Sequence, residues 1–141
     1  MLKNPQFQRQ VIMDHYENPR NKKVHDTYVH KRMDSASCID DITVYANVKD
    51  DIIVDISFEG VGCTISMASV SIMTELVKGK PLAEVKDIIE NYFKMINLES
   101  YDEEILREAI VFQNVGRQAN RIKCATLGWQ GLVWIINEGS V

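Results

Sequence analysis

The sequence lacks any long apolar segment. Its apolar runs, such as LVWII, are far shorter than the roughly 20 residues that a membrane-spanning helix needs. The first residues, MLKNPQFQRQ, lack the apolar core of a secretory signal peptide. No basic patch dominates, and the net charge is −4. We therefore expect a cytosolic protein that binds neither a membrane nor nucleic acid.

The chain has only three cysteines, an odd number: Cys38, Cys63 and Cys124. No two of them form a CxxC pair. An odd count in a cytosolic chain argues against a disulfide framework, because that compartment keeps thiols reduced. Judged from composition alone, the three are most simply small buried hydrophobic residues. Their wide spacing is by itself weak evidence for a metal site.

Repeats, low-complexity tracts and domain linkers are also lacking. The 141 residues suit one domain, residues 1–141, and 45% hydrophobic residues are enough for a core. The order of the expected elements is a helix, a run of strands, then helices. We therefore predict an α+β fold with a small antiparallel sheet.

The expected elements follow from periodicity and capping residues. Asn4 and Pro5 begin a first helix that Asn18-Pro19 ends. Two alternating runs, 42–48 and 52–58, predict a β-hairpin with one buried face, while VHDTYVH is ambiguous. In the second run Ile52, Val54, Ile56 and Phe58 form the apolar face, opposite Ile53, Asp55, Ser57 and Glu59. Helices are expected over 64–78, 82–96, 102–112 and 124–139, and 114–123 is expected to be a polar loop.

The three cysteines and Asp40 fall at the ends of these expected elements. Cys38 and Asp40 lie two residues apart before the hairpin, and Cys63 and Cys124 lie at expected helix starts. Helix N-termini favour thiolate, which binds metals and attacks sulfur. Three thiolates and one carboxylate supply the four ligands of tetrahedral zinc. A buried thiol, half of a metal site and a nucleophile all remain open readings of Cys38.

Other candidate residues have simpler readings. The histidines are expected to be solvated or to cap helices rather than to bind metal, and the two tryptophans to anchor the last helix in the core. The residues concerned are His15, His25, His30, Trp129 and Trp134.

Three motifs resemble the IscU/NifU-like iron–sulfur assembly family: HYENPRNK, FEGVGCTISMASVSIMTELVKGK and RIKCATLGWQGL. Within it the chain resembles the SufU branch. Lys123 stands where IscU proteins have a histidine, Arg121 matches a basic residue of the SufU pattern, and the segment between the second and third cysteines is long enough for the SufU insertion. The chain departs from the family at Ile39, where a glycine is usual.

The resemblance implies a SufE/IscU-like fold with helices packed on one face of the sheet. It implies zinc bound by Cys38, Asp40, Cys63 and Cys124, with iron or a [2Fe-2S] cluster as alternatives. The implied function is acceptance of persulfide sulfur on Cys38 from a PLP-dependent, SufS-like cysteine desulfurase, as an accessory protein that serves downstream iron–sulfur proteins. A cluster scaffold on the same ligands and a purely structural zinc domain are the competing hypotheses.

Overall fold

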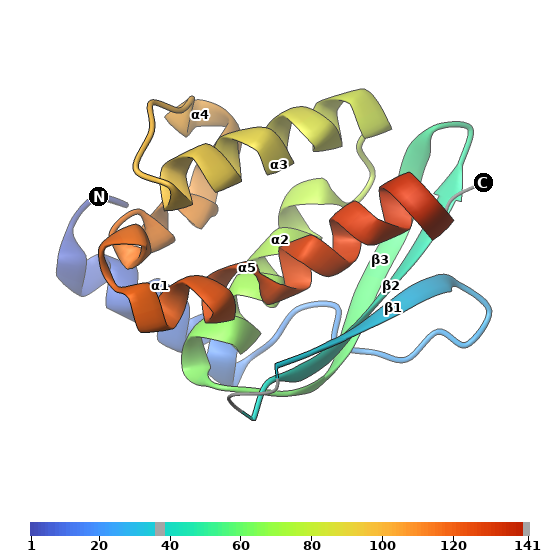
Figure 1. Ribbon diagram of the computed structural model, residues 1–141, viewed down its shortest axis with the longest axis horizontal. Coiled ribbons are helices and arrows are strands. Elements are labelled where there is room, and N and C mark those ends of the chain that lie inside the picture. The colour runs from blue at the N-terminus through green and yellow to red at the C-terminus, as the bar shows by residue number, and fades with distance from the viewer. Residues whose placement is uncertain (36–38, 140–141) are drawn as a thin grey trace.

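The structure is a computed structural model that describes residues 1–35 and 39–139. Helix α1 (Pro5–Glu17) precedes three strands, and the remaining helices follow, as Figure 1 shows. The strands β1 (Val29–Asp34), β2 (Asp41–Lys49) and β3 (Ile52–Val61) form one antiparallel sheet in the order β1-β2-β3. The α+β prediction is confirmed. No helix in the described part of the chain is long and apolar enough to cross a membrane.

Helix α1 begins as its capping residues predict. The Asn4 side chain accepts hydrogen bonds from the backbone N–H groups of Gln6 and Phe7, and Pro5 follows in the first turn. His15, expected to be solvated or capping, is instead 2% exposed. Its ring nitrogens lie 2.8 Å from Ser71 Oγ and 3.0 Å from Glu108 Oε1, so it joins α1 to two later segments.

The hairpin forms as predicted, but a bulge breaks the predicted alternation of β3, so that Ile52 and Val54 are not on the buried face. Asn47 pairs with Asp55 but Val48 pairs with Ile53, so one extra residue lies in β3 between these pairs. The extra residue shifts the inward alternation by one position. Ile53 is therefore fully buried while Val54 is 41% exposed. Only the last two residues of the ambiguous segment 24–30 belong to the edge strand β1, which starts at Val29 and continues to Asp34.

Two helices match the predicted ranges and two differ. Helices α2 (Thr64–Val77) and α3 (Leu82–Ile96) form where expected. The segment expected to be one helix over 102–112 instead forms α4 (Glu103–Leu106) and a 3-10 helix, η1 (Arg107–Phe112), because Arg107 has a left-handed φ of 45°. Helix α5 (Ala119–Trp134) begins five residues before the predicted start. Two short pieces, η2 (Val115–Arg117) and η3 (Ile135–Gly139), flank it.

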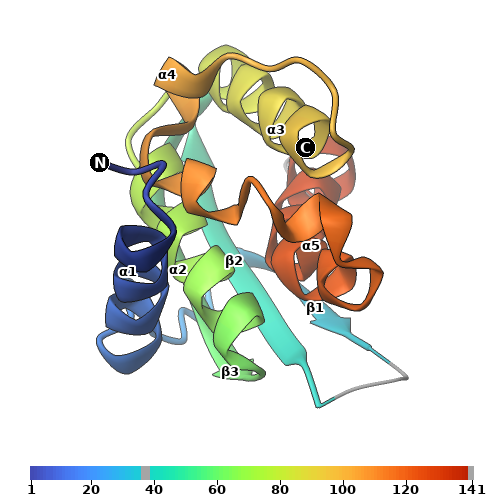
Figure 2. The same ribbon diagram turned by 90° about the vertical axis from the view of Figure 1, so that its left-hand side faces the viewer.

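The helices pack on one face of the sheet around a continuous apolar core. Helix α2 lies between α1 and α5, and α3 crosses above α5 (Figure 2). Trp129 is fully buried as predicted, whereas Trp134 is 37% exposed and carries Lys31 4.8 Å above its ring. The expectation that both tryptophans anchor the core is thus wrong for Trp134, which lies at the exposed end of α5.

Candidate metal centre

Strand pairing brings Asp40 to Cys63. Asp41 is the first residue of β2 and pairs with Val61, the last residue of β3. Because the two strands run antiparallel, the residue before β2 lies beside the residues after β3. Gly62 and Cys63 follow Val61 directly, so the turn from sheet to helix α2 passes over Asp40.

Cys63 is the N-cap of α2, as its expected place at a helix start implies. Its Sγ accepts a hydrogen bond from the backbone N–H of Ser66 at 3.5 Å. The cap sulfur therefore receives one of the unpaired N–H groups of the first helical turn.

Cys124 reaches the same place from α5. Contrary to the prediction, it does not begin this helix but lies in the second turn, since α5 starts at Ala119. One turn further along α5, Gly128 lies against Val70 of α2, where an added Cβ would be 2.7 Å from a Val70 methyl carbon. This close approach of α5 to α2 brings Cys124 to Cys63.

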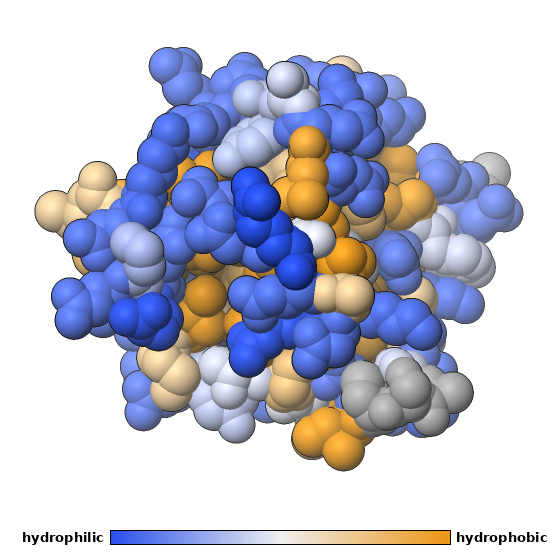
Figure 3. Space-filling model, turned by 60° about the vertical axis from the view of Figure 1, so that its left-hand side comes forward, coloured by the Kyte–Doolittle hydropathy of each residue, from blue (hydrophilic) through white to orange (hydrophobic). Residues whose placement is uncertain are grey.

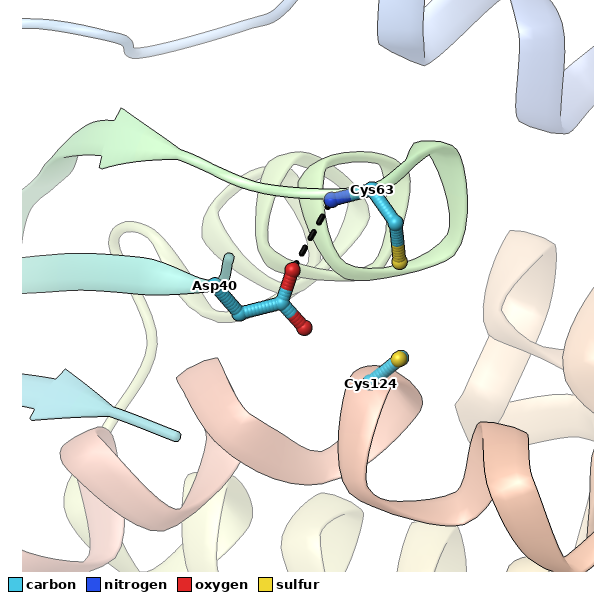
Figure 4. Close-up of side chains that lie close together, drawn as sticks. All are labelled: Asp40, Cys63 and Cys124. Carbon is cyan, nitrogen blue, oxygen red and sulfur yellow. Dashed lines mark hydrogen bonds between the residues drawn. The ribbon is translucent and has the colours of Figure 1, made fainter. Parts of the chain in front are cut away.

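The three side chains form one cluster (Figure 4). One carboxylate oxygen of Asp40 and the sulfurs of Cys63 and Cys124 all lie within 4.8 Å of one another. Asp40 is 2% exposed, and both cysteines are half-buried. Within residues 1–35 and 39–139 this is the one such group of potential metal ligands, and none of the three histidines belongs to it.

Two described residues, Cys63 and Ser66, both bond to the same carboxylate oxygen of Asp40. Oδ1 accepts a 2.8 Å hydrogen bond from the backbone N–H of Cys63 and a 3.0 Å hydrogen bond from Ser66 Oγ. The other oxygen points toward Cys124 in Figure 4. The carboxylate thus has Oδ1 bonded to Cys63 and Ser66 and its other oxygen directed toward Cys124.

The protein without metal keeps Cys124 protonated. Burial, together with hydrogen bonds and charge from Cys63 and Asp40, raises the pKa of this thiol to about 12. The expectation that this cysteine gains thiolate character from a helix N-terminus is therefore wrong. Three acidic groups lie close together, and a metal cation that binds there must displace the Cys124 proton.

The donor set and its geometry fit zinc. Sulfur and carboxylate oxygen are both zinc ligands, and tetrahedral bonding at about 2.3 Å per sulfur separates two sulfurs by about 3.8 Å. The cluster needs only a small contraction from its present span to reach that geometry. It supplies three donors, and the fourth predicted ligand, Cys38, lies outside the described residues.

Sequence reasoning missed the residues that hold the ligands in place. Ser66 contacts Asp40, while Ser69 Oγ and Tyr92 OH each donate a 2.7 Å hydrogen bond to the backbone oxygen of Ala125, beside Cys124. Trp129 donates to Ser69 Oγ at 3.1 Å and stacks on Tyr92. The available signal was the presence of three serines on a helix that is otherwise largely apolar and buried.

Comparisons with known proteins agree on one family. Residues 7–136 match the NifU-like N terminal domain. The zinc-dependent sulfurtransferase SufU of Bacillus subtilis (strain 168) is 42% identical over 125 residues, covering 88% of this chain and 85% of that protein. The iron–sulfur cluster assembly scaffold protein IscU of Thermotoga maritima is 34% identical, covering 87% of each.

A solved structure has the same fold. The crystal structure described as a putative iron–sulfur cluster assembly scaffold protein for the SUF system, FiSufU from Fervidobacterium islandicum AW-1, superposes with a TM-score of 0.84. It is 32% identical, and the alignment covers 88% of this chain and 92% of that one.

Proposed function

The chain belongs to the family of NifU-like N terminal domains, and we propose that it is a zinc-binding sulfur acceptor in iron–sulfur cluster biogenesis. The observation that carries the proposal is the convergence of Asp40, Cys63 and Cys124 within 4.8 Å from three separate elements. A relative that is 42% identical is named a zinc-dependent sulfurtransferase, which supports both the metal and the reaction.

Zinc is held by Cys38, Asp40, Cys63 and Cys124. When bound, it keeps its cysteine ligands deprotonated at neutral pH and lowers their nucleophilicity. Asp40 is the hardest of the four ligands and therefore the weakest partner for zinc. A mixed set of this kind tolerates exchange of one ligand better than four thiolates do.

Cys38 is the sulfur acceptor. Its thiolate attacks the outer sulfur of a persulfide on the desulfurase, the S–S bond of that persulfide breaks, and the desulfurase cysteine leaves as a thiolate. Cys38 then carries the persulfide, and no external oxidant or reductant is needed. The assignment rests on the family resemblance and on the position of Cys38, two residues before Asp40.

The partner is a PLP-dependent, SufS-like cysteine desulfurase. Ile39 and Val61, which adjoin the ligand-bearing turns, are 71% and 62% exposed. Large exposed apolar side chains beside a reactive site suit contact with another protein. On the face that Figure 3 shows, hydrophilic residues predominate, and hydrophobic residues lie among them.

A cluster scaffold is the second candidate function, and the relatives named IscU favour it. The same ligands would hold iron and sulfide instead of zinc. Metal analysis and a visible spectrum of anaerobically purified protein separate the two. Stoichiometric zinc without visible absorption supports the sulfur acceptor, whereas iron with acid-labile sulfide and charge-transfer bands overturns it in favour of the scaffold.

Sulfur transfer has its own test. Protein, desulfurase and cysteine are mixed, and the added sulfur is located by intact and peptide mass spectrometry. We expect one added sulfur on Cys38 and none in Cys38→Ser, whose circular dichroism should remain near that of the parent. An adduct on Cys63 or Cys124 but never on Cys38 would refute the assignment.

A further inference from the structure

We propose that Ser66 is a positioning residue of the metal centre, which fixes Asp40 as a ligand through a single oxygen. The proposal rests on the zinc site proposed above. Ser66 is 1% exposed and belongs to the first turn of α2. Its hydroxyl lies 3.0 Å from Asp40 Oδ1 and 3.6 Å from Cys63 Sγ, and its backbone N–H lies 3.5 Å from the same sulfur. One residue thus contacts two ligands.

The hydroxyl determines which oxygen of Asp40 remains for the metal. Oδ1 already accepts the Cys63 N–H, and the Ser66 hydroxyl adds a second donor to the same oxygen. Two hydrogen bonds lower the capacity of Oδ1 to donate electrons to a cation, which leaves Oδ2 as the better ligand. Partners of this kind orient the ligand and tune its affinity for the metal.

The space for this contact depends on Gly62. A Cβ added at Gly62 would lie 2.8 Å from Asp40 Oδ1 and would also overlap Ser66 Oγ. No side chain can therefore occupy this position without displacing the Asp40–Ser66 pair. The glycine before Cys63 is explained by this steric demand rather than by backbone conformation.

Two variants disrupt the hydrogen bond between Ser66 and Asp40 in different ways. Ser66→Ala removes the hydroxyl and keeps a good helix former in α2, while Gly62→Ala keeps every donor and displaces the pair sterically. Ser71→Ala is the matched control, because it removes another buried hydroxyl from α2 that bonds His15 and the backbone of Arg20 instead of a ligand.

The readouts are metal binding and ligand geometry rather than activity. Zinc affinity is measured by competition with a chromophoric chelator, and the visible spectrum of the Co²⁺-loaded protein reports coordination number. We expect Ser66→Ala and Gly62→Ala to weaken zinc binding about 10- to 100-fold and to alter the cobalt bands. Ser71→Ala should do neither, and the melting temperature of each metal-free variant corrects for loss of folding.

The outcomes are distinct for the two proposals. Parent-like zinc affinity and cobalt bands in both Ser66→Ala and Gly62→Ala overturn the role of Ser66 while the zinc site stands. An equal loss of affinity in Ser71→Ala also overturns it, because the effect would then follow from general destabilisation. If the parent itself binds no zinc, the proposed function fails as well.

Discussion

At the scale of single residues, the two kinds of ligand in the cluster should contribute unequally. Cys63→Ser replaces a thiolate by a weak hydroxyl ligand, yet serine is a good N-cap, so α2 should keep its start. Asp40→Asn removes the charge but leaves an oxygen to accept from Cys63 N–H and Ser66. Because thiolate is the softer and stronger zinc ligand, we expect Cys63→Ser to lose more zinc than Asp40→Asn.

Zinc content after identical dialysis against a chelator measures the difference. The melting temperature of each metal-free variant serves as the control for folding. Full zinc retention in both variants would show that these residues are not ligands.

The candidate ligands could be named from the sequence, but the residues that hold them in place could not. The positions of three cysteines and an aspartate left a metal site open, and the family resemblance named all four as candidate ligands. Asp40, Cys63 and Cys124 lie within 4.8 Å of one another, and Cys38 lies outside the described residues. The role of Ser66 depends on the pairing that places Asp40 beside the start of α2, 26 positions away in the chain. No local pattern encodes such a contact.

At the scale of secondary structure elements, the spacing of α2 and α5 should control the metal centre. In Gly128→Ala the new methyl group would lie 2.7 Å from a Val70 methyl carbon, so the helices must separate. Overpacking of this kind costs about 1–3 kcal/mol. Because Cys63 and Cys124 belong to these two helices, zinc affinity should fall together with the free energy of unfolding.

Chemical denaturation of the metal-free protein and zinc competition measure the two effects. Gln130→Ala, an exposed change on the same helix, is the control and should alter neither. A stable Gly128→Ala protein with parent-like zinc affinity would contradict the idea that helix spacing sets the distance between the two sulfurs.

Helix α3 contacts the backbone beside Cys124 through the hydroxyl group of Tyr92. Tyr92 is fully buried, and its OH donates a 2.7 Å hydrogen bond to the backbone oxygen of Ala125. The same oxygen also accepts a hydrogen bond from Ser69 Oγ. Tyr92→Phe therefore leaves that oxygen with one donor. We expect a loss of about 1 kcal/mol in the free energy of unfolding, with zinc affinity nearly unchanged. A loss above about 3 kcal/mol would mean that Ser69 does not keep its bond.

Elements with strong periodicity were predictable, and those set by tertiary contacts were not. Helix α3 has the predicted bounds because its apolar residues recur at helical spacing between Pro81 and Asn97. The bulge in β3 was not visible, since Val54 continues the alternation and only the pairing with β2 reveals the extra residue. The early start of α5 lies in a polar stretch without a capping side chain, which resembles a loop.

At the scale of the whole molecule, the site lies at a junction of otherwise separate parts. Zinc would join the start of β2, the start of α2 and the second turn of α5. The core extends well beyond this junction. Its largest fully buried side chains include Trp129, Tyr92, Phe58, Phe112 and Met73. We therefore expect the metal to strengthen a fold that already has a substantial apolar core.

Removal of the metal should thus lower stability without abolishing folding. A ligand that binds only the native state at 1,000 times its dissociation constant stabilises it by about 4 kcal/mol. For a protein of this size that corresponds to about 8–16 °C in melting temperature. Excess chelator should lower the melting temperature by roughly 10 °C, while far-ultraviolet circular dichroism at 25 °C stays nearly constant. Cys63→Ser, already depleted of zinc, should not respond. An unchanged melting temperature after confirmed metal loss would exclude a structural contribution, and complete unfolding at 25 °C would show that the apolar core is insufficient alone.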